Sequence, residues 1–339
     1  MKRIFLIALA GLILASALPA AKTLDMWVID TEGGKALLLL SPDGQSMLVD
    51  TGFPGFNGRD TNRILEACQA AGVAKLDFLV TTHYDGDHVA NTPSVVAKIP
   101  VDTFVDHGPV SPYDPRAQKS FQAYDALPKP KRLVVKPGDR IPFKGVEVLV
   151  LTSATQMIKG PLKGAGAANP GCALTQVKTW SGMNEDTSEN AYGIGLLYTY
   201  GRFRMLDLAD LTWNREKELM CPNDPIGPVD LLMVSHHGSD WSSSPALLAP
   251  IRPRVAIMNN GERKVGAASV MQDLKAMPGL QALYLLHWSA NAPDDNPPDE
   301  FIANLRGNDE GKWVKVSAET NGTFTVTNAR NGQSKIYKR

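Results

Sequence analysis

The stretch Thr81–His88, "TTHYDGDH", places two histidines and two aspartates within six positions, directly after the apolar run "LDFLV". Such a run, ending in polar residues, is typical of a buried strand followed by a turn. Imidazole nitrogens and carboxylate oxygens both bind zinc at about 2.0 to 2.2 Å, and a short loop can aim several of them at one point. The stretch is therefore a metal site or an unusually polar turn, and its density of ligating groups favours the metal. The candidate ligands are His83, Asp85, Asp87 and His88.

A second histidine-rich turn follows another apolar stretch, in "VDLLMVSHHGSDWSSS". Two adjacent histidines at the end of a buried strand are hard to explain as core residues, so this turn strengthens the metal hypothesis. Neighbouring residues of a strand point to opposite faces, which predicts that only one of His236 and His237 binds the metal directly. We assign His236 to the metal and His237 to the substrate, although alternation alone leaves their order open.

Two aspartates lie between these turns in an apolar setting, in "FRMLDLADL". A buried carboxylate needs a partner, and a metal ion is the partner that the neighbouring motifs suggest. We predict that Asp210 binds the metal, and that Asp207 caps the following helix or supports the site through a hydrogen bond. A cap before "LTWNREKEL" is the alternative for both. His107 and His287 also end apolar strands, and each either lines the site or is a structural histidine.

Both halves of the chain show strands, a helix and then a buried strand that ends in a polar cluster. The first half has helical spacing in "DTNRILEACQAAG", residues 60–72, and the second has it after the histidine pair. This repetition predicts a sandwich of two sheets with the site at one edge. Residues 152–189 are irregular, read as a loop over the site with disorder as the alternative, and the tail alternates like a terminal β-hairpin.

The first 21 residues have the pattern of a secretory signal peptide: a basic start, a short apolar run and an alanine-rich end. An uncleaved membrane anchor is the alternative. We expect a periplasmic or secreted protein whose residues 22–339 form a single domain, with no membrane span after signal removal. Export would permit one disulfide, for which Cys172 and Cys221 are the candidates, while Cys68 is expected to be buried.

The charge balance does not indicate binding to nucleic acid. Without residues 1–21 the chain has 33 basic and 35 acidic residues, a net charge of about −2, whereas nucleic-acid binding favours a basic surface. The one local basic run, "PKPKR" at 128–132, reads as a solvated loop. The sequence does not indicate an oligomeric state.

The two histidine motifs resemble those of the metallo-β-lactamase superfamily, whose signature is HxHxDH. Here Asp85 stands where that signature has its second histidine. The hydrolase domain of the DNA-uptake protein ComEC has the same aspartate version, and "HHGS" and the "DTG" at residues 50–52 also resemble this ComEC-like subgroup. The resemblance runs from about Thr23 to Gly261.

The resemblance implies an α/β fold, the αββα metallo-β-lactamase sandwich, with one or two Zn²⁺ ions between the sheets. His83 and Asp85 would hold the first ion, and Asp210 would bridge to the second. The second ion would be bound by Asp87, His88 and one of the paired histidines. The family's middle histidine has no counterpart, and Asn190 lies near its place. Because Asp85 adds a harder oxygen donor, we expect a shift from pure zinc toward manganese or mixed occupancy.

These features predict an exported metallo-hydrolase that uses a metal-activated hydroxide. A bound divalent ion lowers the pKa of water from 15.7 to about 7. Asp87 would orient the nucleophile, and His237 or Tyr84 would stabilise the developing negative charge. We expect a small-molecule or phosphodiester substrate, most readily a phosphodiester or phosphate ester. The alternatives are a β-lactam or lactone hydrolase, or a non-catalytic metal-containing binding module.

Overall fold

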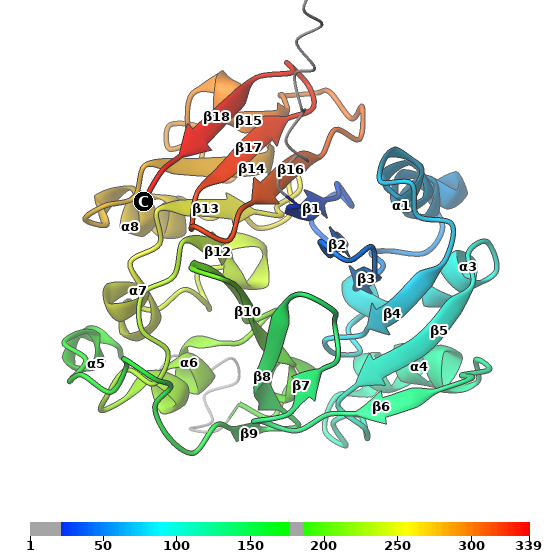
Figure 1. Cartoon of the computed structure of the whole chain (residues 1–339), viewed down its shortest axis with the longest axis horizontal. Helices are drawn as coiled ribbons and strands as arrows, with labels where there is room; N and C mark the ends of the chain where they lie inside the picture. Colours follow the sequence, from blue (N-terminus) through cyan, green and yellow to red (C-terminus); the bar gives the residue numbers. More distant parts are fainter. Residues whose placement is uncertain (1–21, 177–185) are drawn as a thin grey trace, which may run out of the picture.

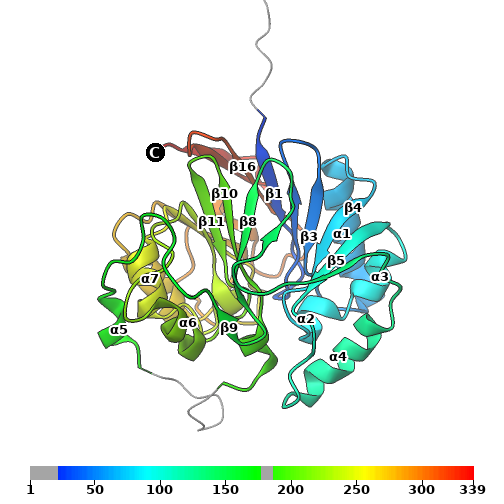
Figure 2. The same ribbon diagram turned by 60° about the horizontal axis from the view of Figure 1, so that its bottom comes forward.

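The computed structural model describes residues 22–176 and 186–339. The signal peptide predicted at residues 1–21 lies outside the described residues. Within the described part, the strands form two mixed sheets of nine strands each. Figures 1 and 2 show the two sheets facing each other, with helices on the outer face of each.

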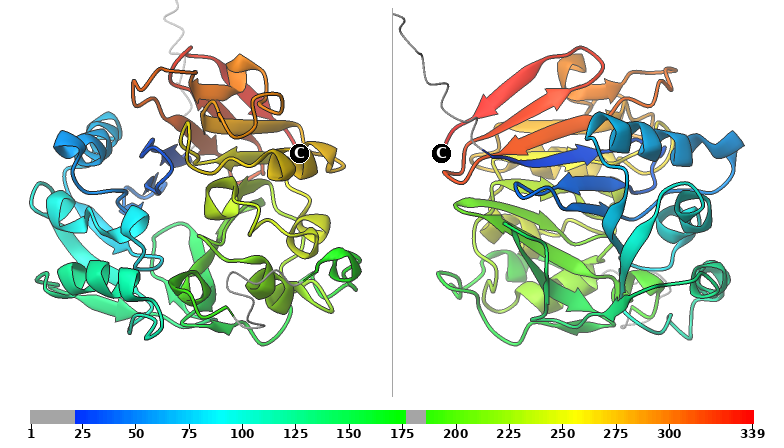
Figure 3. Two further views of the ribbon diagram at one scale, coloured as in Figure 1. Left: turned by 180° about the vertical axis from the view of Figure 1, so that it is seen from behind. Right: turned by 45° about the vertical axis from the view of Figure 1, so that its right-hand side comes forward.

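The first sheet combines strands from both ends of the described chain, because β1 pairs with β16 as well as with β2 (Figure 3). Strands β3 to β6 are parallel to one another, and the other pairs are antiparallel. In spatial order the strands are β18 (Ser334–Tyr337), β17 (Phe324–Asn328), β16 (Val314–Ala318), β1 (Leu24–Val28), β2 (Leu37–Leu40), β3 (Ser46–Val49), β4 (Leu76–Val80), β5 (Val101–Asp106) and β6 (Arg132–Val134).

The second sheet is parallel from β11 to β15 and antiparallel elsewhere. A short strand, β9 (Gln156–Met157), pairs with β8 at its edge. In spatial order the others are β15 (Ile302–Asn304), β14 (Ala282–His287), β13 (Val255–Met258), β12 (Leu231–Met233), β11 (Phe203–Asp207), β10 (Gly195–Tyr200), β8 (Glu147–Ser153) and β7 (Arg140–Ile141).

Three buried clusters hold these layers together. Alternation along β2 illustrates the pattern, since Leu37 and Leu39 enter the cluster between the sheets and Leu38 enters the cluster under the helices. The helices covering the first sheet are α1 (Arg59–Ala70), α2 (Gly86–Val89), α3 (Thr92–Val96) and α4 (Pro115–Asp125). Those covering the second are α6 (Trp213–Met220), α7 (Pro245–Ile251) and α8 (Ala268–Ala276). The predicted αββα sandwich is therefore confirmed.

Part of the segment predicted as an irregular insertion packs beside α7. Its short helix α5 (Gly171–Leu174) contacts α7, and Asn169 donates from Nδ2 to the carbonyl of Ala246 at 2.7 Å. The predicted disulfide between Cys172 and Cys221 is present, and Cys68 is buried with a free thiol, as expected. None of the helices in the described residues is both long and apolar enough to cross a membrane.

Candidate metal centre

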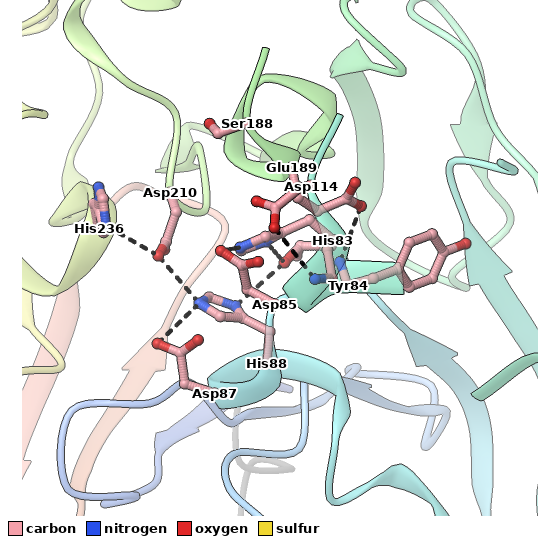
Figure 4. A network of polar contacts seen from close by, with 12 residues as sticks. His83, Tyr84, Asp85, Asp87, His88, Asp114, Ser188, Glu189, Asp210 and His236 are labelled. Carbon is pink, nitrogen blue, oxygen red and sulfur yellow. Dashed lines mark hydrogen bonds and ion pairs between the residues drawn. The ribbon is translucent and has the colours of Figure 1, made fainter. Parts of the chain in front are cut away.

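The predicted ligands come from strand ends of both sheets. The strand β4 leads into the loop with His83 and Asp85 and then into α2, which carries Asp87 and His88. In the second sheet β11 ends just before Asp210, and β12 ends before the turn η3 (Ser235–Gly238). Because β11 and β12 are parallel, their carboxyl ends lie at the same edge of the sheet. Figure 4 shows the side chains converging there.

Four side chains form a compact cluster, since one ligand atom from each lies within 4.8 Å of all the others. The Nε2 atom of His88 lies 3.2 Å from Oδ2 of Asp210 and 3.2 Å from Nε2 of His237. His237 Nε2 lies 3.2 Å from Asp210 Oδ2 and 3.4 Å from Asp87 Oδ2. Two imidazoles and two carboxylates at such spacing are a typical donor set for a divalent transition metal. We call Asp87, His88, Asp210 and His237 the metal cluster.

Further donor atoms lie beside this cluster. His83 Nε2 is buried without a hydrogen-bond partner among the described residues, and it lies 3.7 Å from Oδ2 of Asp85. His236 Nε2 lies 3.7 Å from the same Asp210 oxygen that faces the cluster. A buried imidazole nitrogen without a partner is costly unless something binds it. A second cation held by these residues, with Asp210 between the two positions, would supply that partner.

The electrostatics of the metal cluster also fit a bound cation. Burial disfavours the charged form of His88, but the carboxylates of Asp210, Asp50 and Asp87 outweigh it and raise the pKa of this imidazole well above its usual range. Burial and the neighbouring charge of Asp87 raise the pKa of Asp85 to about 7. In the absence of metal, His88 of the cluster and the neighbouring Asp85 thus retain protons that a divalent cation would replace.

Asp50 and Asn259 contact the Nδ1 atoms of two metal-cluster histidines, on the ring edge away from Nε2. The sequence analysis gave neither residue a role in the site. The Oδ2 atom of Asp50 lies 2.9 Å from Nδ1 of His88 and accepts a hydrogen bond from Thr82 Oγ1 at 2.7 Å. The amide of Asn259 lies 2.9 Å from Nδ1 of His237. Such contacts fix ring orientation and leave Nε2 for the metal. In the sequence, the place of Asp50 at a strand end, in "DTG", could have indicated this supporting role. No comparable feature of the sequence points to Asn259.

The structure does not place the paired histidines as we assigned them from the sequence. His237 enters the metal cluster, whereas His236 lies on the other side of Asp210, with its Nδ1 held 3.2 Å from Ser242 Oγ. The physical reason is the backbone, because φ is +52° at His236 and +54° at His237. Both residues therefore belong to a left-handed turn, to which the alternation of a strand does not apply.

Tyr84 does not line the metal centre, and the prediction that it stabilises negative charge is wrong. Its ring points away from Asp210 and His88 in Figure 4 and packs against His107, Phe121 and Tyr124. Its hydroxyl donates to the carbonyl of Gly108 at 2.8 Å. The side chain is fully buried, so its role is to anchor the loop after β4.

The two remaining candidates, Asp207 and Asn190, lie in different surroundings. Asp207 has a support role, since its Oδ1 accepts from the amide of Ala209 at 3.0 Å and from Nζ of Lys35 at 2.5 Å. Asn190 lies in the short turn η2 (Glu189–Tyr192), outside the metal cluster, and its buried Oδ1 has no hydrogen-bond partner in the described chain.

A buried glutamate, which the sequence analysis did not consider, fixes the loops beside the metal centre. The Oε1 atom of Glu189 accepts from the amide of Tyr84 at 3.1 Å and lies 2.8 Å from His107 Nε2. Its Oε2 accepts from the amide of Ser111 at 2.7 Å. His107 is therefore a structural histidine.

His287 belongs to a second polar cluster rather than to the metal centre. Its Nε2 lies 2.7 Å from Oδ1 of Asp30 and 3.3 Å from Oε1 of Glu32. Arg63 pairs with Asp30 at 2.8 Å and also with Asp309. The positive charge of this side chain therefore already compensates the carboxylates of the cluster. We interpret the cluster as a buried ion-pair network that ties β14 to the loop after β1.

This network predicts a pH dependence of stability. Burial lowers the pKa of His287, but the hydrogen bond and charge of Asp30 outweigh it and raise that pKa above its usual value. The protonated imidazole therefore stabilises the fold fully below its unfolded pKa of about 6.5, and this contribution is lost as the pH rises through the folded pKa. We expect His287→Gln to lower the free energy of unfolding by about 1–3 kcal/mol at pH 6 and by less at pH 9. Urea unfolding of both proteins at the two pH values checks this; an equal effect at both would contradict it.

Comparison with known proteins supports a metallo-β-lactamase superfamily domain. The model of the metallo-β-lactamase superfamily matches residues 30–170, which include the motif after β4 but end before Asp210 and the histidine pair. No curated protein matches the chain. The fold and the site together thus define a metallo-β-lactamase-like sandwich with a candidate metal centre, and the finer subgroup rests on the motifs alone.

Several solved structures are similar to the chain at low identity. The metallo-β-lactamase fold protein YhfI from Bacillus subtilis is 12% identical with a TM-score of 0.45, over 78% of this chain and 96% of that protein. A metallo-β-lactamase from Cronobacter sakazakii is 14% identical with a TM-score of 0.34, over 55% of this chain and 60% of that enzyme. The diiron β-hydroxylase CmlA from Streptomyces venezuelae is 15% identical with a TM-score of 0.38, over 71% of this chain and 45% of that enzyme.

Proposed function

We propose that the chain is an exported, metal-dependent hydrolase of phosphodiester or phosphate-ester substrates, of the ComEC-like kind. The observation that carries this proposal is the metal cluster, in which four ligating side chains from two separate sheets meet within 4.8 Å. A fold that needed only a polar turn would not require Asp87 and His88 of the first sheet to meet Asp210 and His237 of the second.

The ligating residues would form two cation sites. Asp87, His88, Asp210 and His237 would hold one cation, and His83, Asp85 and His236 would hold a second one beside Asp210. Divalent cations at such a site supply an activated water and stabilise the charge that develops on attacking and leaving oxygens. Asp87, whose side chain is 17% exposed, reaches both the cluster and the solvent side, so it can also orient the attacking water.

Two features favour a phosphate ester over other hydrolysable groups. Ligand sets on both sides of Asp210 suit two cations, and paired cations clamp the attacking and leaving oxygens of an in-line displacement at phosphorus. The aspartate version of the motif and "HHGS" also resemble the ComEC-like hydrolases. A β-lactam or lactone hydrolase and a non-catalytic metal-containing module are the alternatives.

Nucleic acid as the natural substrate has less support. In the basic run at residues 128–132, Arg132 pairs with Asp106 at 2.7 Å, and Lys129 donates from Nζ to the carbonyl of Tyr124 at 2.7 Å. These charges are used within the fold, whereas binding to a nucleic-acid backbone needs several free cations. A small phosphate ester or phosphodiester fits better.

We propose Zn²⁺ as the cation, with Mn²⁺ as the alternative. Two imidazoles in the metal cluster suit zinc, whereas the carboxylates of Asp85, Asp87 and Asp210 add the harder donors that manganese accepts. Metal analysis of protein purified without added metal distinguishes the two. Stoichiometric zinc with no manganese would contradict a shift toward manganese or mixed occupancy.

The proposed hydrolase activity is tested by removing and restoring the metal. We expect the purified protein to hydrolyse bis(p-nitrophenyl) phosphate, to lose this activity after treatment with a chelator, and to regain it when Zn²⁺ or Mn²⁺ is added. Bound metal without turnover of this ester, a lactone or a β-lactam would favour the binding module. Turnover of a lactone or β-lactam alone would favour the alternative class of hydrolase.

Export is part of the proposal because of the cysteine pair. The disulfide between Cys172 and Cys221 is a bond that persists in oxidising compartments and is rare in the cytosol. Together with the leader pattern of residues 1–21, it supports a periplasmic or secreted protein. Fractionation of cells that express the full chain tests this, and a cytosolic product that retains the leader would contradict it.

A further inference from the structure

A lysine from the second sheet lies against the metal cluster and plays no part in the proposed metal binding. Lys264, in the loop that follows β13, forms an ion pair with Oδ2 of Asp87. Its Nζ also donates to the carbonyl of Gly33 at 2.6 Å and lies 4.7 Å from the centre of the Phe53 ring. A positive charge therefore stands directly beside a predicted metal ligand.

Close packing holds this lysine in position. A Cβ atom on Gly33, where φ is +83°, would lie only 2.8 Å from Cβ of Lys264, so glycine is needed for the two loops to approach. The loop is also bonded to the histidine turn, since the amide of Gly266 donates to the carbonyl of His237 at 3.0 Å. The backbone that carries Lys264 is thus fixed to both sides of the metal centre.

The exposure of Lys264 distinguishes it from the other cations nearby. Its side chain is 39% exposed, whereas the side chain of Lys35, which pairs with Asp207, is 5% exposed. Arg59 is engaged with Asp60 at 2.7 Å, and the side chain of Arg63 is 9% exposed in its pairs. Cations as buried as Lys35 and Arg63 are not accessible to an incoming anion. Lys264 instead presents its charge both to Asp87 and to solvent.

This position suits the recognition of an anion. When a metal cation takes up the charge of Asp87, the attraction between Lys264 and that carboxylate weakens, and the ammonium group is free to pair with an incoming anion. Lysine is a compact point charge with three donors, which is a common partner for phosphate oxygens. We propose that Lys264 binds an anionic oxygen of the phosphate group of the substrate and so selects phosphate esters over neutral esters. This inference rests on the proposed function, because it assigns the substrate class of the same site.

The test compares Lys264→Gln with Lys264→Arg in the metal-loaded protein. We expect Lys264→Gln to raise KM for bis(p-nitrophenyl) phosphate about tenfold or more, as for the loss of a charge-assisted hydrogen bond, with kcat changed less than about threefold. Metal content should not change, and Lys264→Arg should recover most of the loss. Lys275→Gln, which removes an exposed lysine that lies 4.0 Å from Asp295, is the matched control and should leave KM unchanged.

A binding measurement separates this inference from the proposed function. We expect calorimetry to show that inorganic phosphate binds the metal-loaded protein about tenfold more weakly after Lys264→Gln. If the protein hydrolyses no phosphate ester but phosphate affinity still depends on Lys264, the hydrolase proposal fails and this inference stands. An unchanged KM and phosphate affinity, or a loss of bound metal in Lys264→Gln, would overturn the inference.

Discussion

Replacing His237 with alanine is expected to remove the tightly bound metal ion and to lower the turnover of bis(p-nitrophenyl) phosphate on the order of 10²–10³-fold. The Nε2 atom of His237 lies 3.2 to 3.4 Å from Asp87 and Asp210, so its loss opens the metal cluster. Substitutions that only disturb the partners of metal ligands already cost about 10–100-fold in metal affinity, and a direct ligand should cost at least as much.

His236→Ala is the matched control for this prediction, because the two histidines are adjacent in sequence. The Nε2 atom of His236 lies 3.7 Å from Asp210, outside the metal cluster, so this variant should keep the tightly bound ion. Metal content after dialysis against a weak chelator, measured together with turnover, decides between the two. Loss of the tight ion in His236→Ala, with its retention in His237→Ala, would contradict this prediction and favour His236 as the direct ligand.

The sequence predicts those parts of the site whose residues follow a buried strand along the chain. His83, Asp87 and His88 follow β4, and Asp210 comes soon after β11. The apolar run that predicts each strand therefore also indicates where these ligating side chains lie. The repeated order of strands, a helix and a buried strand in the two halves predicts the sandwich, and the structure has the two sheets. Local patterns therefore indicate which side chains reach the edge between the sheets.

What the sequence does not predict depends on backbone conformation and on contacts between the two halves. The left-handed backbone at His236 and His237 carries no signal in a strand pattern, so the sequence does not predict which of the two joins the metal cluster. Tyr84 looked like a site residue from its neighbours, but its ring fills a buried aromatic cluster. Lys264 is 177 residues from Asp87 in sequence, and only the packing of the two sheets brings them together.

Beneath the metal centre, a buried ion pair joins the two halves of the sandwich. Nζ of Lys35 lies 2.5 Å from Oδ1 of Asp207, and the two side chains are 5% and 3% exposed. The backbone amide of Lys35 donates to the carbonyl of Asp87 at 3.1 Å, so the pair adjoins a predicted metal ligand. Burial lowers the pKa of Lys35, but the charges of Asp207 and Asp50 outweigh it, raise this pKa and keep the lysine charged.

Lys35→Met is expected to lower the free energy of unfolding by about 3–5 kcal/mol, because it leaves the carboxylate of Asp207 buried without its cation. The double variant Lys35→Met/Asp207→Leu should recover much of this loss, since replacing both partners of a buried pair by apolar side chains is often nearly neutral. Lys75→Met breaks the exposed pair with Asp102, whose side chains are 48% and 52% exposed, and should cost less than about 1 kcal/mol. Denaturant unfolding of the three variants measures these differences. A double variant as unstable as Lys35→Met would show that the lysine acts through packing rather than through the charge of Asp207.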